Sequence, residues 1–291
     1  MSLEDKLTSG KFLVLAEMDP PKGVDVTGLV ANAFRVKGKV DAYVVPEMSN
    51  AVMRMSSLGG CMVLQSKGLE TVLQVCCRDR NRLALQADLL AAYSLGISTL
   101  MAVAGVDPGY GDHHRTLAVN DINLMELLQG IRTLQEGKDM AGIELAGAPK
   151  FCVGSTTNAG TIEGPLEAEI EEMEKKAAVG VRFFVTPPVF DIQPLQRLLR
   201  ATADRGMKIV PTVLLLKSAG MAGYINRHIE HVSVPSELIR RIQKAPDRPR
   251  ECVRIAAELV SAIRRTRAAG VLLSTIGWED KLAQILEGVE T

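Results

Sequence analysis

Eight short runs of apolar and β-branched residues alternate along this chain with longer stretches whose apolar residues recur every three or four positions. Runs of the first kind are typical of buried strands, and stretches of the second kind are typical of amphipathic helices. The predicted strands are Phe12–Glu17, Asp41–Pro46, Thr71–Cys77, Thr99–Ala104, Phe151–Gly154, Arg182–Thr186, Lys208–Leu215 and Val271–Thr275. Among the helical stretches, Arg250–Ile263 carries one apolar stripe, and Glu167–Ala178 is charged enough to be an exposed helix.

Eight β/α units within 291 residues favour a (β/α)8 barrel, a fold of about 250 residues. A doubly wound open sheet is the alternative, and it is expected to carry a glycine-rich phosphate-binding fingerprint. The glycine-rich segment Gly105–Gly111 does not have the GxGxxG spacing, and no Gly-Lys-Ser/Thr follows it. No low-complexity linker divides the chain. We therefore predict an α/β fold, a TIM barrel that forms a single domain over residues 1–291.

The composition excludes several classes of function. Lysine plus arginine and aspartate plus glutamate both total 34, and aromatic residues make up only 4%, so the chain offers neither a basic field nor a stacking surface for nucleic acid. No apolar stretch approaches the roughly 18 residues of a membrane span, and the first residues lack the layout of a signal peptide. Five cysteines without CxxC spacing indicate reduced thiols. We expect a cytoplasmic protein with no nucleic-acid or membrane partner.

Polar residues follow the predicted strands at their carboxyl ends, where the active sites of barrels lie. Glu17 ends the first strand, just before Pro20 and Pro21, and is either a solvated strand-end charge or an acid aimed into the barrel mouth. In the second case desolvation raises its affinity for a proton, as a general acid requires. Asp107 either caps a turn or faces the same mouth. The segment Arg78–Arg82 follows the third strand and could also face the mouth. Its simpler interpretation is a solvated helix start with Asp79 as the N-cap.

The histidines do not indicate a metal site. Asp112, His113 and His114 are adjacent in a glycine-rich loop and lack the ligand spacing of structural zinc sites. His228 and His231 are separated by about one helical turn, which is more typical of a surface helix than of a ligand pair. No Ser-His-Asp or Cys-His arrangement stands out, so the residues by themselves predict a barrel enzyme with acidic groups at its mouth.

Taken together, five blocks of sequence resemble the methylenetetrahydrofolate reductase family, in the order that the family has them and over nearly the whole chain. The blocks are EMDPPKG from Glu17, CRDRNRLALQADLLAAYSLGI from Cys77, LMAVAGVDPGYGDH from Leu100, KKAAVGVRFFVTPPVFD from Lys175 and GVLLSTIGWED from Gly270. Any one of them is weak evidence, but the set is specific. The nearest likeness is to the short, barrel-only reductases of anaerobic bacteria.

The resemblance implies a barrel with a flavin across its mouth, FAD or alternatively FMN, and reduction of 5,10-methylenetetrahydrofolate to 5-methyltetrahydrofolate, reversibly in some members. It implies that Glu17 is the catalytic acid that protonates the folate, while reduced flavin delivers hydride. Asp107 and Thr186 then fall at substrate-binding positions. The implied cofactor-binding residues are Gln74, Gly105, Asp107, Asp121, Gly154, Asn158 and Lys176.

Several departures from the family pattern affect how the ligands are held. Pro187 replaces a glutamine expected to bind the pterin, Val106 is inserted between Gly105 and Asp107, and the second strand end lacks the threonine–tyrosine block of NADH-using relatives. These changes favour electron delivery from an iron–sulfur partner subunit over a direct NAD(P)H site, and we expect an oligomer. Two alternatives remain: a folate-barrel methyltransferase that works with a corrinoid protein, and a non-catalytic assembly subunit.

Overall fold

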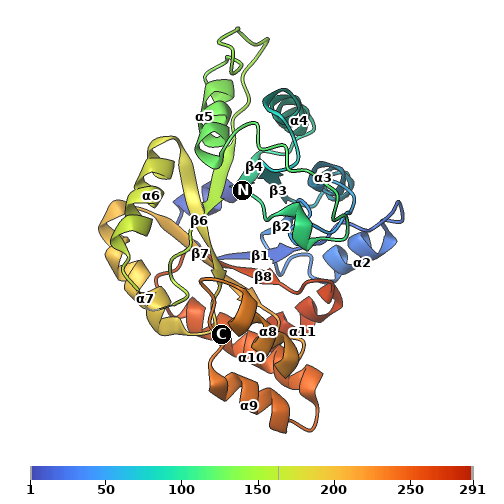
Figure 1. Cartoon of the computed structure of the whole chain (residues 1–291), viewed down its shortest axis with the longest axis vertical. Coiled ribbons are helices and arrows are strands. Elements are labelled where there is room, and N and C mark those ends of the chain that lie inside the picture. The colour runs from blue at the N-terminus through green and yellow to red at the C-terminus, as the bar shows by residue number, and fades with distance from the viewer. Residues whose placement is uncertain (1, 163, 290–291) are drawn as a thin grey trace.

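The eight predicted strands all form, and they close into one parallel barrel in which each strand pairs with the next and the last pairs with the first (Figure 1). The computed structural model describes residues 2–162 and 164–289. The strands are β1 Leu13–Glu17, β2 Ala42–Val45, β3 Thr71–Cys76, β4 Thr99–Val103, β5 Cys152–Thr156, β6 Val181–Pro188, β7 Lys208–Leu214 and β8 Gly270–Ser274. The predicted (β/α)8 barrel is therefore confirmed.

Helices surround the strands, as expected where parallel strands are joined by helical crossovers. They are α1 Leu3–Thr8, α2 Thr27–Arg35, α3 Ser57–Gln65, α4 Arg82–Ser94, α5 Leu124–Gln135, α6 Glu167–Ala178, α7 Ile192–Ala201, α8 Ala219–His228, α9 Ser236–Lys244, α10 Arg248–Arg264 and α11 Leu282–Glu287, with short 3-10 helices η1 Pro108–Tyr110, η2 Ala203–Arg205 and η3 Glu279–Lys281. The predicted helix over residues 167–178 coincides with α6, and that over residues 250–263 lies within α10.

Two strands extend further than predicted. The prediction ended the fifth strand at Gly154, but β5 continues to Thr156, and β6 runs through Pro187 to Pro188 instead of ending at Thr186. Prolines donate no backbone hydrogen bond and are tolerated in a sheet mainly at irregular positions. The pairing of β6 with β7 is irregular at this point, shifting register between Val185 and Pro188.

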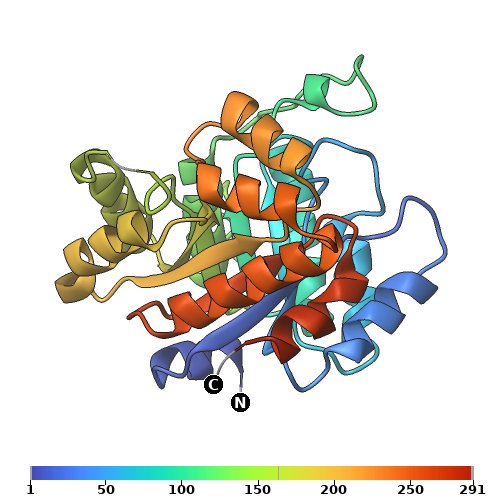
Figure 2. The ribbon, with the colours of Figure 1, turned by 90° about the horizontal axis from the view of Figure 1, so that it is seen from below.

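Alternation along the strands divides the apolar residues into an inner and an outer layer. The inner layer includes Leu15, Val44 and Leu272, and α1 closes the amino-terminal end of the barrel by adding Leu3 and Leu7 to it. The outer layer packs the strands against the surrounding helices. In side view, α1 and both marked chain ends lie at one end of the barrel, and the loop that follows β4 (green) lies at the other (Figure 2). The carboxyl ends of the strands form this second end, which we call the mouth.

Cys76, the last residue of β3, and Cys77, which follows it, point to opposite sides of the barrel wall. Cys77 belongs to the outer apolar layer, whereas the Cys76 thiol lies 3.5 Å from the carbonyl oxygen of Ala104 at the end of β4. All five cysteines are buried and free. Burial raises the pKa of Cys77 to about 12, so this thiol is neutral and unreactive at physiological pH.

Inside the barrel, Gly154 of β5 lies opposite Phe183 of β6. A β-carbon at Gly154 would lie 2.2 Å from the Phe183 ring, closer than any ordinary contact. The glycine therefore makes room for the aromatic ring that fills this part of the interior.

Replacing Gly154 by alanine is expected to lower the free energy of unfolding by about 1–3 kcal/mol, because the added methyl group overpacks the core. Chemical denaturation measures the change. The additional substitution Phe183→Leu should recover part of the loss, and Gly28→Ala, in open space on α2, should be neutral or slightly stabilising. Equal stability of Gly154→Ala and the unmodified chain would contradict this packing explanation.

Candidate active site

The seam where β1 meets β8 brings Glu17 beside Ser274. Leu15 pairs with Leu272, so the next inward-facing residues along these strands are Glu17 and Ser274. The Ser274 hydroxyl donates a hydrogen bond to Glu17 Oε1 at 2.6 Å. The carboxyl group thus lies at the mouth with a fixed orientation, which decides between the two sequence interpretations in favour of an inward-facing acid.

The environment of Glu17 favours its protonated form. Burial is the largest effect and raises the pKa of this carboxyl group to about 7, while the Ser274 hydrogen bond opposes the rise and the negative charges of Asp19 and Glu279 add to it. An acid with this pKa is partly protonated at neutral pH. Glu17 can therefore give up or take a proton under physiological conditions, as a general acid or base must.

A lysine and two further carboxylates surround this acid. Asp19 Oδ2 lies 3.9 Å from a guanidinium nitrogen of Arg54, and Glu279 accepts a hydrogen bond from the Gly277 amide at 2.9 Å. Lys217 donates to the carbonyl oxygen of Ile276, and its ammonium group lies 5.3 Å from the centre of the Trp278 ring. Burial raises the pKa of both Asp19 and Glu279, and the positive charge of Lys217 opposes both shifts. We call Glu17, Asp19, Lys217 and Glu279 the mouth cluster.

Sequence reasoning missed Lys217 and Glu279 as members of the site. Lys217 follows β7 by three residues and Glu279 follows β8 by five, so both obey the rule that chemistry sits after the strands of a barrel. Inspection of the seventh strand end would have found Lys217. Glu279 is harder to find, because its approach to Asp19 depends on the path of the segment after β8.

Asp107 performs the turn-capping role that the sequence left open. Its side chain accepts a hydrogen bond from the Gly109 amide at 2.7 Å and caps η1, and the residue is exposed. Gly105 has a φ of +90°, and a β-carbon there would lie 2.4 Å from the Cys76 sulfur. Packing within the chain therefore requires this glycine. A role for either residue in ligand binding remains a prediction.

The predicted N-cap at Asp79 is wrong. The N-cap of α4 is Asn81, whose side chain accepts from the Ala84 amide. Asp79 instead forms a two-point ion pair with Arg78, both contacts being 2.7 Å. Arg78 is almost fully buried and also donates to the carbonyl oxygen of Val106 at 3.1 Å, so it holds the loop after β4 against β3 and is no solvated helix start.

Gln74 and Thr186 are both buried and hydrogen-bonded within the barrel wall. Gln74 Oε1 accepts from the amide of Glu47 at 2.9 Å. The Thr186 hydroxyl donates to the carbonyl oxygen of Pro187 at 2.7 Å, and the Thr212 hydroxyl donates to the Thr186 carbonyl oxygen at 2.7 Å. These bonds fix the ends of β3 and β6, and a ligand contact by Gln74 or Thr186 remains a prediction.

Lys176 and Asn158 come together with the carboxyl end of β5. The Lys176 ammonium group donates to the carbonyl oxygen of Thr156 at 2.8 Å, and burial lowers the pKa of this lysine. The backbone amide of Asn158 donates to Glu169 Oε2 at 3.1 Å, and the residue is exposed. Lys176 therefore places a positive charge at this strand end, and a ligand contact by Lys176 or Asn158 remains a prediction.

Asp121 lies apart from these groups, before α5. Its carboxylate accepts from both the backbone amide and the guanidinium of Arg82 at 2.9 Å. These hydrogen bonds lower the pKa of Asp121. The predicted cofactor contact by Asp121 therefore competes with an ion pair that already satisfies the carboxylate.

Within residues 2–162 and 164–289, no group of three histidine, cysteine, aspartate or glutamate side chains is arranged to hold a metal ion. Asp112 pairs instead with Lys22 and with His113 Nδ1, the latter at 2.8 Å, and these bonds hold the pKa of its carboxyl group well below the usual range. The expected surface helix through His228 and His231 is only partly right. Helix α8 ends at His228, and His231 lies beyond it with a φ of 59°.

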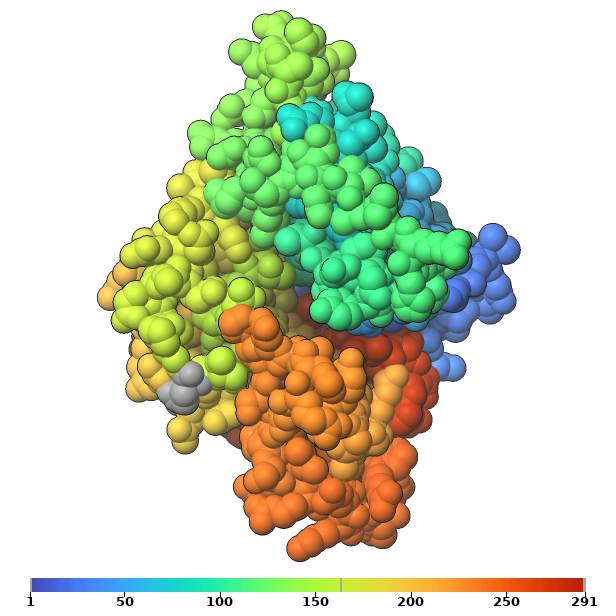
Figure 3. Space-filling model, viewed as in Figure 1, coloured from blue at the N-terminus to red at the C-terminus, as the bar shows by residue number. Residues whose placement is uncertain are grey.

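A hollow opens at the centre of the mouth, between the loop after β4 (green) and α8 (orange), as Figure 3 shows. Beside it the β4 loop lines a cavity of about 430 Å³, a size common for small-molecule sites. Its lining combines apolar side chains, Val106 and Leu117, with the polar Asp107, Thr116 and Asn120. A cavity with this lining can accommodate a ligand that has both an apolar part and hydrogen-bonding groups.

A sequence model of the family described as methylenetetrahydrofolate reductase matches residues 2–290, essentially the whole chain. Among solved structures, a 2,3-dimethylmalate lyase of the PEP mutase/isocitrate lyase superfamily superimposes with a TM-score of 0.56 at 10% identity, covering 98% of this chain and 84% of that one. DmoA from Hyphomicrobium sulfonivorans gives a TM-score of 0.52 at 8% identity, covering 96% and 86%. At such identities the structural likeness establishes the barrel fold alone.

None of the described helices combines the length and apolar character required to cross a bilayer.

The raised pKa of Glu17 predicts a specific pH dependence of stability. The folded protein binds the Glu17 proton more tightly than the unfolded chain does. The contribution of Glu17 to the free energy of unfolding should therefore be largest below about pH 4.5 and fall as the pH rises towards 7. Glu17→Gln keeps an acceptor for Ser274 but carries no charge. At pH 8 we expect Glu17→Gln to be more stable than the unmodified chain by about 1–3 kcal/mol.

Urea denaturation at a series of pH values measures this effect. Glu230→Gln changes an exposed glutamate to the same amide and should follow the unmodified chain at every pH. Parallel curves for Glu17→Gln and the unmodified chain between pH 4.5 and 8 would show that Glu17 is not desolvated.

Proposed function

The chain belongs to the methylenetetrahydrofolate reductase family, and from that premise we propose that it reduces 5,10-methylenetetrahydrofolate to 5-methyltetrahydrofolate with a bound flavin. The observation that carries the proposal is Glu17, an inward-facing acid at the barrel mouth whose pKa is about 7. A family member of this kind needs a proton donor beside a hydride donor, and Glu17 has the protonation equilibrium for the first role.

In this proposal Glu17 protonates a nitrogen of the five-membered folate ring, which opens to an iminium ion. A bound reduced flavin supplies the hydride that converts this carbon to a methyl group. The Ser274 hydroxyl holds the carboxyl group at one oxygen, leaving the other to face the substrate. Asp19 and Glu279 disfavour a charged Glu17 and so keep the proton available. In the reverse direction, the same carboxylate takes the proton back.

We assign the substrate-binding roles to Asp107 and Thr186. The exposed carboxylate of Asp107 supports its role, since among residues 2–162 and 164–289 it accepts a hydrogen bond only from the Gly109 amide. Thr186 is buried, and it would act by placing the end of β6 where the pterin binds. Pro187 has no side-chain amide, so the pterin must find its hydrogen bonds elsewhere, and the mouth cluster offers carboxylates for its amino groups.

For the flavin, FAD or FMN, the proposed binding residues are Gln74, Gly105, Asp107, Asp121, Gly154, Asn158 and Lys176. The best-supported of these is Lys176, whose ammonium group lies at the end of β5 and suits a cofactor phosphate. Gly105 and the 430 Å³ cavity beside it leave room for part of the cofactor. Gln74 and Gly154 would contribute through the shape of the barrel wall, since both are engaged within it.

The remaining assignments are also proposals. We infer that residues 1–291 form one domain, that the protein works in the cytoplasm in one-carbon metabolism leading to methionine, and that it assembles as an oligomer. Electrons would come from an iron–sulfur partner subunit, or alternatively from NAD(P)H. The absence of the threonine–tyrosine block from the second strand end supports the partner.

The direct test is Glu17→Gln. We expect the variant to retain its flavin, as measured by the absorbance of the purified protein at roughly 450 nm. Folate turnover should fall by about 10²–10⁴-fold, as is typical on loss of a general acid. Reduction of the flavin by an artificial donor should continue. Glu230→Gln provides the matched control and should keep full turnover.

Three outcomes would overturn the proposal. Undiminished folate turnover by Glu17→Gln would remove Glu17 from the chemistry. Methyl transfer from methyltetrahydrofolate to a corrinoid protein by flavin-free protein would indicate a methyltransferase. A chain that binds neither FAD nor FMN, and whose complex is unaffected by Glu17→Gln, would be an assembly subunit.

A second test uses Ser274→Ala. Because the Ser274 hydrogen bond lowers the pKa of Glu17, its removal should raise that pKa further. The acid then stays protonated to higher pH, so the alkaline fall of kcat/KM for folate reduction should move to higher pH. Ser274→Thr retains a hydroxyl and should restore the original profile. An unchanged profile for Ser274→Ala would separate this hydrogen bond from the proton transfer.

A further inference from the structure

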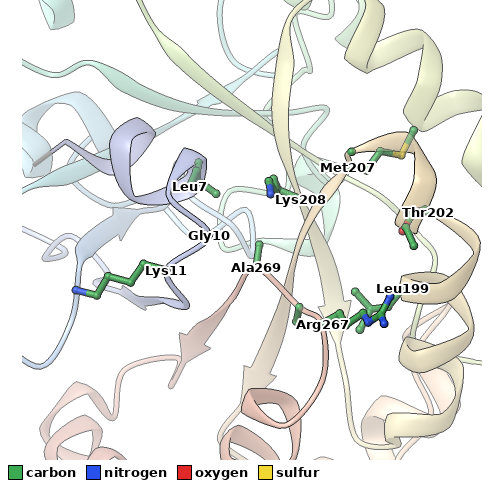
Figure 4. A pocket seen from close by; sticks show the side chains of 12 residues that line it. Leu7, Gly10, Lys11, Leu199, Thr202, Met207, Lys208, Arg267 and Ala269 are labelled. Atoms are coloured by element: carbon green, nitrogen blue, oxygen red, sulfur yellow. The ribbon is translucent and has the colours of Figure 1, made fainter.

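The end of the barrel opposite the mouth carries a hollow of about 240 Å³, bounded by the end of α1, the start of β7, η2 and the segment that leads into β8 (Figure 4). Its lining includes Lys11, Lys208 and Arg267 and contains no carboxylate. A second hollow of about 270 Å³ adjoins it and shares Leu199 and Arg267. The second lining adds Arg200 and Arg265, again without an acid.

Some of these basic residues have a purely structural explanation. Lys11 forms an ion pair with Asp41 at 3.7 Å, and Figure 4 shows it extending away from the other side chains of the hollow. Arg200 lies in the last turn of α7, and Arg265 caps the carboxyl end of α10, where positive charges favourably meet the helix dipole. These residues need no ligand to account for them.

Lys208 and Arg267 have no such explanation. Lys208 is the first residue of β7 and has the same parity as the inner-layer residue Val210, so it faces the barrel interior beside Leu7 of α1. Arg267 belongs to the connection between α10 and β8, outside any helix end. Within the part of the chain that the structure describes, neither side chain forms a hydrogen bond or an ion pair. Lys208 is nonetheless half-buried.

We propose that this hollow, the basal site, binds a phosphate group of a small ligand, with Lys208 and Arg267 as its charged contacts. A half-buried ammonium group without a partner gains from an anion more than an exposed one does, because solvent screens it less. Arginine binds phosphate in a two-point geometry, and lysine adds a compact charge. The volume of about 240 Å³ lies below the range of sites for larger organic ligands and suits one or two phosphate groups.

The basal site is independent of the proposed reaction. Lys208 begins β7 and Arg267 precedes β8, whereas Glu17 and Ser274 end their strands at the mouth. A phosphate group held by Lys208 and Arg267 would bridge the start of β7 and the entry to β8, beside the end of α1. Binding there would stabilise the closure of the barrel without contacting the folate or the flavin.

Isothermal titration calorimetry with sodium pyrophosphate, at constant ionic strength, tests the proposal. We expect saturable binding of one pyrophosphate per chain, which Lys208→Gln and Arg267→Gln each weaken at least about tenfold, as loss of a charge-assisted hydrogen bond should. Inorganic phosphate should bind more weakly. The control pair Lys150→Gln and Arg240→Gln removes equal charge from exposed positions and should change the affinity less than about twofold.

Thermal unfolding without pyrophosphate checks that each variant is folded. If Lys208→Gln does not fold, Arg267→Gln still decides the test, because Arg267 is exposed and its replacement should not disturb the fold. A further variant, Lys176→Gln, alters the proposed cofactor-phosphate contact at the mouth, and it should leave pyrophosphate binding at the basal site unchanged. Loss of binding in Lys176→Gln would place the anion at the cofactor site and overturn the proposal. Absence of saturable binding, or equal weakening in the control pair, would do the same.

Discussion

The hydrogen bond from Ser274 to Glu17 joins the first strand of the barrel to the last, across 257 positions of sequence. It exists only because the sheet closes: in an open sheet β1 and β8 would be opposite edges, and Glu17 would face solvent. Closure desolvates the carboxyl group and gives it a partner in the same step. The raised pKa of Glu17, on which the proposed proton transfer depends, is thus a consequence of barrel topology.

Two groups of charged side chains lie at opposite ends of the barrel. Three carboxylates and Lys217 gather at the mouth, whereas the opposite end presents Lys208 and Arg267 around a hollow without acids. The equal totals of acidic and basic residues in the chain, 34 of each, do not reveal such local groups. Salt screens interactions between exposed charges that are more than about 10 Å apart. The charges around each site therefore affect a ligand more than the net charge of the chain does.

Several residues singled out by family resemblance are held by the protein itself. Gly154 makes room for Phe183, Gly105 for Cys76, and Asp121 binds Arg82. Such positions shape the walls and loops of the mouth. A ligand contact at these residues and a packing requirement there are compatible, because a loop that is held rigidly offers a preorganised surface to whatever binds it.

The sequence by itself determined the barrel and the position of Glu17 at its first strand end, because hydrophobic periodicity is a local property and strand ends follow from it. Tertiary structure alone decided that the pKa of Glu17 is raised, that Lys217 and Glu279 accompany it, and that Asp79 pairs with Arg78 and does not cap a helix. The environment of Glu17 depends on groups that are distant in sequence, and even the pairing of the adjacent Arg78 and Asp79 depends on how the chain packs around them. A pKa or an ion pair is set by distances in space, which no local pattern encodes.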